Sequence, residues 1–157
     1  MKHPSPWEEP RIHLVDVRLV HETEAQYRVR QAADVARLLH ELVGKADREH
    51  FVAVYLDARH RVTHVHTVSV GHLVGSLVHP REVFKGALLA NAAAMVVGHN
   101  HPSGDVQPSP EDLRIHERLQ EAGELLGIEL LDAVVVGPGR KFFSQAEGVV
   151  RELPAEG

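Results

Sequence analysis

The segment Ala94–Asp112, AMVVGHNHPSGDVQPSPED, carries the clearest structural pattern in the chain. Its first five residues are an apolar run typical of a short buried strand, and the run ends just before His99. Ser109 is followed by Pro110 and then by two acidic residues, a pattern typical of a helix N-terminus. The segment therefore predicts a strand, a loop that carries two histidines, and a helix that runs to about Leu126.

This segment also places three potential metal ligands at a defined spacing. His99 and His101 are two positions apart, so both imidazoles project to one side of an extended segment. Asp112 comes eleven residues after the second histidine, and a loop that contains proline and glycine can return its carboxylate to the same point. Two neutral imidazoles and one carboxylate leave a fourth position for water, as in catalytic zinc sites.

A carboxylate near such a site could act as acid and base. Zinc lowers the pKa of a bound water to about 7, but a neighbouring carboxylate is still useful to accept the proton and pass it to the leaving group. Glu49 and Glu82 are the two candidates for this role.

The length and composition of the chain indicate one domain. A chain of 157 residues, 43% of them apolar, is long enough for one sizeable core and short for two. We expect a flexible tail over residues 1–10, one domain over 11–150 and a C-terminal tail over 151–157. No apolar run reaches the roughly 18 residues of a membrane span, and the first residues lack the apolar stretch of a secretory signal. We therefore expect a cytoplasmic protein without a membrane partner.

Two features of the composition narrow the chemistry. The chain has no cysteine, which excludes disulfides, thiolate nucleophiles and cysteine-ligated metal sites. Any metal must then be held by His, Asp and Glu. The formal net charge of -5 does not favour binding to nucleic acid, although a local basic patch is compatible with it.

Hydrophobic periodicity predicts an α/β fold. The predicted strands are 12–20, 51–57, 61–70 and 128–136, and the predicted helices are 29–43 and one that begins at Pro80. A further strand and a short helix are expected in the C-terminal part of the chain. A short polar turn separates 51–57 from 61–70, which is typical of a hairpin. Mixed strands and helices without a repeat indicate a single domain in which helices flank a mixed central β-sheet.

The motif spacing is similar to that of a known family. The spacing of the motif is His-x-His, seven residues, Ser, two residues, Asp. It resembles the JAMM motif of JAB/MPN metalloproteases. The RadC branch of that family is resembled by the segments 77–84 (LVHPREVF) and 98–105 (GHNHPSGD). The resemblance runs from about Leu14 to Gly148 and implies a JAB/MPN domain of the cytidine deaminase-like fold. It also implies one zinc ion per chain, with the ligands His99, His101 and Asp112.

The same resemblance implies roles for two further residues. Ser109 would polarise the scissile carbonyl and stabilise its oxyanion. The family's catalytic glutamate stands at the start of a strand of the central sheet, and Glu49 fits that place because it is followed closely by the apolar run 52–56. Glu82 opens a predicted helix, where the helix dipole alone explains a carboxylate. We therefore expect Glu49 to be the catalytic acid and base.

These features predict a zinc metallohydrolase, a metallopeptidase or isopeptidase in which zinc-activated water attacks the carbonyl of a peptide or isopeptide substrate. A RadC-type DNA-processing factor or nuclease and a non-catalytic MPN interaction module are the alternatives. RadC proteins usually carry an N-terminal helix-hairpin-helix DNA-binding segment, and we expect none here because few residues precede Leu14. The family also tends to have Asp-His where this chain has Asp132-Ala133, so the role of that histidine is lost or moved.

Several histidines and the Ser109–Asp112 pair can also be explained by a purely structural role. Ser109 and Asp112 form a Ser-x-x-Asp helix start, which is compatible with metal binding. His64 and His66 are expected on an exposed strand face, and His79 is expected to be a helix cap, a packed residue or a residue that lines the site. Other zinc chemistries are excluded, because His-Glu-x-x-His does not occur and nucleobase deaminases need a Cys-x-x-Cys pair.

Overall fold

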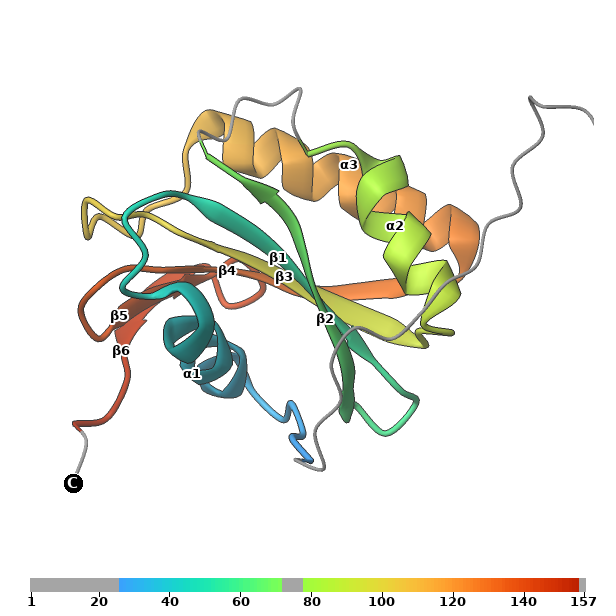
Figure 1. Cartoon of the computed structure of the whole chain (residues 1–157), viewed down its shortest axis with the longest axis horizontal. Helices are drawn as coiled ribbons and strands as arrows, with labels where there is room; N and C mark the ends of the chain where they lie inside the picture. The colour runs from blue at the N-terminus through green and yellow to red at the C-terminus, as the bar shows by residue number, and fades with distance from the viewer. Residues whose placement is uncertain (1–25, 72–77, 156–157) are drawn as a thin grey trace, which may run out of the picture.

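One mixed β-sheet forms the centre of the domain. The computed structural model describes residues 26–71 and 78–155 of the chain. Within these ranges the elements are α1 (Ala32–Val43), β1 (His50–Leu56), β2 (Val62–Val70), α2 (Pro80–Leu89), β3 (Ala94–Asn100), α3 (Pro110–Leu126), β4 (Glu129–Val136), β5 (Lys141–Ser144) and β6 (Val149–Glu152). The strand order is β2-β1-β3-β4-β5-β6, with β3 and β4 parallel and the other neighbours antiparallel. Figure 1 shows α1 on one face of the sheet and α2 with α3 on the other, so the predicted fold class is confirmed.

Side-chain alternation along the central strands divides the apolar core in two. Odd-numbered residues of β1 and β3 pack with α2 and α3, and even-numbered residues pack with α1. The same alternation at the end of β3 places His99 on the α3 side of the sheet and Asn100 on the α1 side. The ring of His99 accordingly stacks on that of Phe51, with 6.1 Å between the ring centroids.

Helix α3 begins at the residues that the sequence predicts. The Ser109 hydroxyl accepts a hydrogen bond from the Asp112 N–H at 3.1 Å, and the Asp112 carboxylate accepts one from the Ser109 N–H at 2.8 Å. Pro110 occupies the first turn, where its missing N–H needs no partner. The helix ends at Gly127, whose φ of 73° is a left-handed conformation that glycine adopts without strain. This capping places the first turn of α3 beside the end of β3.

Of the other two helices, α1 begins later than predicted and α2 begins where it was predicted. Helix α1 begins at Ala32 rather than at residue 29, because the Asp34 carboxylate accepts hydrogen bonds from the N–H groups of Arg30 and Gln31 at 2.9 and 3.1 Å. Helix α2 begins at Pro80 as predicted, and the His79 side chain caps it. Among the described helices, none combines the length and the apolar character that crossing a membrane requires.

The expected short helix in the C-terminal part is wrong within the described residues. Residues 137–155 contain instead the antiparallel pair β5 and β6. Gly148, with φ of 70°, closes the turn between them, and its N–H donates to the Ser144 carbonyl at 2.8 Å. Strand β6 crosses the expected domain boundary at residue 150, and Leu153 packs into the core on the α1 side. The predicted strand 12–20 lies outside the described residues.

The predicted hairpin forms between β1 and β2, and its two histidines differ in surroundings. His64 is exposed, as expected, but His66 is half-buried. Nδ1 of His66 lies 2.9 Å from the Tyr55 hydroxyl, which donates its proton to the Val83 carbonyl at 2.7 Å. Burial lowers the pKa of His66. His66 therefore belongs to the contact between β2 and α2 rather than to an exposed strand face.

Candidate metal centre

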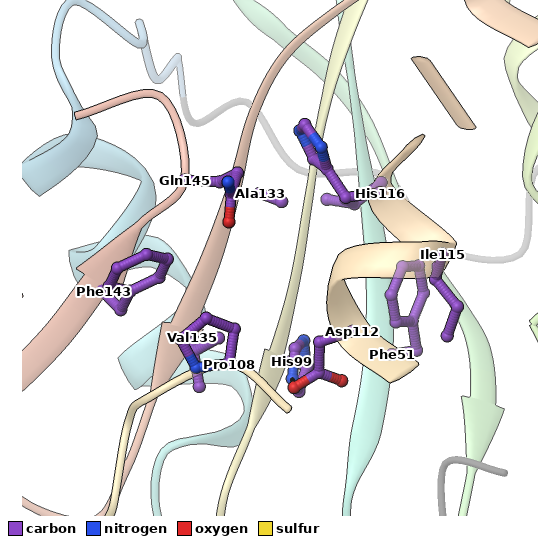
Figure 2. Close-up of a pocket in the computed structure, with 11 residues that line it drawn as sticks. Phe51, His99, Pro108, Asp112, Ile115, His116, Ala133, Val135, Phe143 and Gln145 are labelled. Carbon is purple, nitrogen blue, oxygen red and sulfur yellow. Dashed lines mark ion pairs between the residues drawn. The ribbon is translucent and has the colours of Figure 1, made fainter. Parts of the chain in front are cut away.

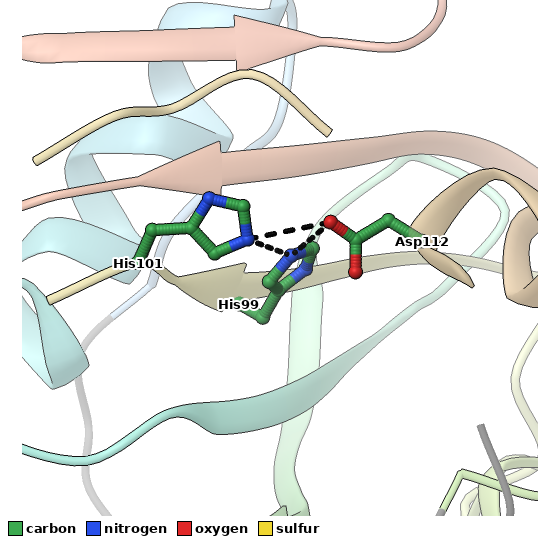
Figure 3. Close-up of side chains that lie close together, drawn as sticks. All are labelled: His99, His101 and Asp112. Atoms are coloured by element: carbon green, nitrogen blue, oxygen red, sulfur yellow. Dashed lines mark hydrogen bonds and ion pairs between the residues drawn. The ribbon is translucent and has the colours of Figure 1, made fainter. Parts of the chain in front are cut away.

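Three side chains converge where β3 ends and α3 begins (Figure 3). Nε2 of His99 lies 3.0 Å from Nε2 of His101, and Oδ2 of Asp112 lies 3.2 Å from the first nitrogen and 3.3 Å from the second. The side chains are only 8%, 14% and 8% exposed in the order His99, His101, Asp112. Within the described ranges, these three form the one cluster of His, Cys, Asp or Glu side chains whose geometry could hold a metal ion.

Backbone contacts explain why the loop brings these residues together. The His101 N–H donates to the Val136 carbonyl at 2.8 Å, which extends the pairing of β3 with β4 by one residue. The chain then turns, as the Gly104 N–H donates to the His101 carbonyl at 3.0 Å and the Gln107 N–H to the Asp105 carboxylate at 3.1 Å. These turns return the chain to the end of β3, where α3 starts.

A backbone contact fixes the tautomer of His101. Nδ1 of its ring lies 2.7 Å from the Asp105 carbonyl oxygen, which can only accept, so Nδ1 carries the hydrogen. In the neutral ring, Nε2 then presents its lone pair toward His99 and Asp112. Such an outer hydrogen bond to a carbonyl is typical of metal-binding histidines.

The charges at the cluster favour a bound cation. The hydrogen bond to Asp112 raises the pKa of His101, against the opposing effect of burial. Burial alone would raise the pKa of Asp112, but hydrogen bonds from His101 and His99 outweigh this effect. The pKa of the carboxyl therefore lies well below its usual range. One carboxylate and two imidazole nitrogens therefore face each other and need a proton or a metal ion between them.

The donor set and its spacing fit zinc. Tetrahedral coordination with zinc–ligand distances of about 2.0–2.2 Å places neighbouring ligand atoms ~3.4 Å apart. The observed separations of 3.0, 3.2 and 3.3 Å are close to this value. Nitrogen and carboxylate donors also suit other divalent transition metals, so the geometry is compatible with several metals and does not select one.

Asn100, between the two histidines, holds the chain on both sides of Glu49. Its side chain is 0% exposed and lies on the opposite face of β3 from the histidines. Its Oδ1 accepts from the His50 N–H at 2.7 Å, and its Nδ2 donates to the Arg48 carbonyl at 2.9 Å. The Glu49 carbonyl in turn accepts from the Gly71 N–H at 2.8 Å. These contacts make Asn100 a link between the histidine loop and Glu49.

The two glutamates lie in different surroundings. The half-buried Glu49 is close enough to add to the raised pKa of His101, after the larger effect of Asp112. Glu82 lies in the first turn of α2 and pairs with Lys85, with 2.6 Å between carboxylate and ammonium. Its pKa is lowered, chiefly by the hydrogen bond from Lys85. Glu82 is thus explained by its helix, whereas Glu49 stands near a candidate ligand.

Ser109 is exposed at the mouth of the cluster. Its oxygen accepts the Asp112 N–H, so its own hydroxyl hydrogen is available to a further acceptor. Capping and a contact with a bound carbonyl are therefore compatible at this residue.

A small pocket, which sequence patterns did not predict, adjoins the cluster (Figure 2). His99 and Asp112 line it as well as the metal site. His116, one helical turn after Asp112, and Ala133 line its other end. The position where the RadC branch tends to have a histidine is thus a small residue here, and a histidine from α3 lines the same pocket. Its other lining residues are Phe51, Val97, Pro108, Ile115, Val135, Phe143 and Gln145.

Comparisons with known proteins agree with this architecture. The model of the RadC-like JAB domain family matches residues 29–150. A UPF0758 protein of Rubrobacter xylanophilus is 53% identical over 115 residues, which are 73% of this chain and 50% of that protein. UPF0758 proteins of Bacillus licheniformis and Methanosarcina acetivorans are 48% and 42% identical over 78% and 82% of this chain, and over 54% and 56% of their own lengths.

The chain therefore spans about half the length of these relatives. The match covers the sheet, all three helices and the candidate metal centre, and ends within β6. From the family match and these relatives, we conclude that the chain belongs to the RadC-like JAB domain family.

Proposed function

We propose that this domain hydrolyses peptide or isopeptide bonds with a zinc ion held by His99, His101 and Asp112. The proposal is carried by the convergence of two imidazole nitrogens and one carboxylate oxygen at near-tetrahedral spacing. Three protein ligands leave one position for water, which is the composition of catalytic rather than structural zinc sites. Membership of a JAB-domain family supports the same chemistry.

The surrounding residues have matching roles in this proposal. A bound zinc ion would supply Lewis acidity and lower the pKa of a water molecule to about 7. The Glu49 carboxylate accepts a proton from the attacking water and delivers it to the departing nitrogen. The Ser109 hydroxyl donates to the carbonyl oxygen as negative charge develops there. The Asp105 carbonyl keeps His101 in the tautomer whose Nε2 faces the ion.

Hydrolysis by zinc-loaded protein tests the proposal. The substrates are a panel of linear peptides, branched isopeptides and single- and double-stranded nucleic acids. We expect cleavage of amide substrates, and we expect Glu49→Gln to keep its zinc while losing about 100-fold or more of the rate, the usual contribution of acid–base catalysis. Glu82→Gln is the matched control, because it makes the same change at a carboxylate paired with Lys85.

Each other outcome has a definite meaning. A loss of rate in Glu82→Gln but not in Glu49→Gln would assign the acid and base to Glu82. Cleavage of nucleic acids without cleavage of any amide would reject the proposal in favour of a nuclease. Stoichiometric zinc without hydrolysis of any substrate would favour the non-catalytic interaction module.

A further inference from the structure

We propose that the pocket beside the metal centre binds a short apolar side chain of the substrate, on the residue that contributes the scissile carbonyl. This inference rests on the proposed function, because it takes the metal centre as the anchor of the substrate. It adds a preference for one class of residue, which neither the family match nor the names of the relatives specify.

The pocket opens directly from the metal ligands. His99 and Asp112 line both spaces, and Figure 2 shows them at one end of the pocket. A carbonyl held at the centre thus has its neighbouring side chain beside this opening. The connection gives the pocket a defined relation to the bond that is cleaved.

The walls of the pocket are apolar. Phe51 and Ile115 lie on one side, and Val135, Phe143 and Pro108 on the other. Both phenylalanines are almost fully buried, at 3% and 8% exposed, so their rings are held in place by the core. Rigid apolar walls favour an apolar side chain, whose burial is favourable, over a polar one, whose desolvation is costly.

The far end of the pocket carries no free charge. His116 and Gln145 lie there, and burial lowers the pKa of His116, which keeps the imidazole neutral at pH 7. The nearby Asp132 carboxylate is engaged by the Ser144 hydroxyl at 2.6 Å and by the N–H groups of Ala133 and Ala146 at 2.7 and 3.0 Å. The far end of the pocket therefore offers no ionic partner to a charged substrate side chain.

The size of the pocket limits its occupant to a short side chain. Its cavity volume is about 20 Å³, on a scale where about 10–15 Å³ admits one water molecule. This space admits about one methyl-sized group, so it suits the methyl of alanine and not an indole ring. Ala133, which is half-buried at the far end, leaves this space open because its side chain is a single methyl.

Binding of amino-acid hydroxamates to the zinc-loaded full chain tests the pocket without requiring turnover. The hydroxamate group chelates zinc, and the adjoining side chain then probes the pocket. N-acetylated hydroxamates of glycine, alanine, valine, aspartate and tryptophan are compared by isothermal titration calorimetry. A buried methyl should strengthen binding about four-fold, so the alanine compound should bind about four-fold more tightly than the glycine compound. The aspartate and tryptophan compounds should bind no more tightly than glycine.

Filling the pocket provides the matching variant. Ala133→Val adds two methyl groups on a strand, where a β-branched residue is well tolerated. We expect the glycine compound to keep its affinity within about two-fold and the advantage of the alanine compound to disappear. Ala58→Val makes the same change in an exposed turn at the other end of β1 and should leave both affinities unchanged.

The outcomes separate this inference from the proposed function. Equal binding of all five compounds would overturn the pocket while leaving the metal centre intact. An advantage of the alanine compound that survives in Ala133→Val would place its side chain elsewhere and also overturn the inference. If Ala133→Val fails to fold, the order alanine, glycine, tryptophan in the unaltered chain still decides the matter. Failure of every compound to bind would reject the metal-anchored site and the pocket together.

Discussion

Replacement of Asn100 by alanine should destabilise the domain by about 2–3 kcal/mol. The fully buried amide makes hydrogen bonds of 2.7 Å to the His50 N–H and 2.9 Å to the Arg48 carbonyl, some fifty residues away in sequence. A buried group left without its partner costs about 1–3 kcal/mol. We expect about 1–1.5 kcal/mol for each of the two groups, in the lower part of that range, because Arg48 is an exposed residue and water can reach part of the loop.

Urea unfolding followed by circular dichroism measures this loss. In a chain of this size the same change lowers the melting temperature by about 4–12 °C. Gln120→Ala, which removes an exposed amide from α3, is the control and should stay within about 0.5 kcal/mol of the unaltered protein. A loss below about 0.5 kcal/mol in Asn100→Ala would refute the view that Asn100 fastens the loop before β1.

The same variant also tests how Glu49 is positioned. The Asn100 side chain lies on the face opposite the histidines, so zinc loading should persist near one ion per chain. Hydrolysis should fall by about 100-fold, because a displacement of about 1 Å in a reacting group can cost that much. An unchanged rate in a measurably destabilised variant would show that the position of Glu49 does not depend on Asn100.

Three further changes have expected outcomes. Gly86→Ala should lower the free energy of unfolding in urea by about 1–3 kcal/mol, because its new Cβ would clash with the Tyr55 hydroxyl and lie 2.9 Å from His66 Nδ1. Gly139→Ala, whose new Cβ meets nothing within 4 Å, should not lower it. Equal losses in both variants would contradict this packing. Zinc at 100 times its dissociation constant should stabilise the domain by about 2.7 kcal/mol, measured as a rise in melting temperature that a chelator reverses and that His101→Ala does not show. Asp112→Asn should keep the fold, since an amide oxygen can still accept from the Ser109 N–H. It should weaken zinc binding by more than the roughly 10- to 100-fold typical of losing a residue that only hydrogen-bonds to a ligand. Competition with a fluorescent zinc chelator measures the affinity, and a smaller loss would remove Asp112 from the ligand set.

The parts of the site that follow local rules could be predicted from the sequence. Residues two apart on a strand share a face, and a Ser-x-x-Asp pattern starts a helix, so His99, His101 and Asp112 could be placed from spacing alone. The same rules gave the hairpin and the first residue of α2. The loop between His101 and Ser109 had to return to the end of β3, and its turns do so within the described structure.

Features that depend on distant contacts could not be predicted. The partners of Asn100 lie in the loop after α1 and at the first residue of β1. The pocket draws residues from β1, β3, α3, β4 and β5 as well as the loop before α3. The C-terminal residues form a second small hairpin because Phe142 and Phe143 pair with Arg151 and Val150 across the turn at Gly148. A short stretch with two aromatic residues is compatible with helix or strand, and its pairing with β4 decides between them.

The central claim is that His99, His101 and Asp112 bind a zinc ion. The most direct test is the metal content of the purified full chain, measured by elemental analysis beside the double variant His99→Ala/His101→Ala. We predict about one zinc per chain in the unaltered protein and none in the variant, with both proteins folded by circular dichroism. Equal zinc content in the two, or no zinc in the unaltered protein after loading, would contradict the account.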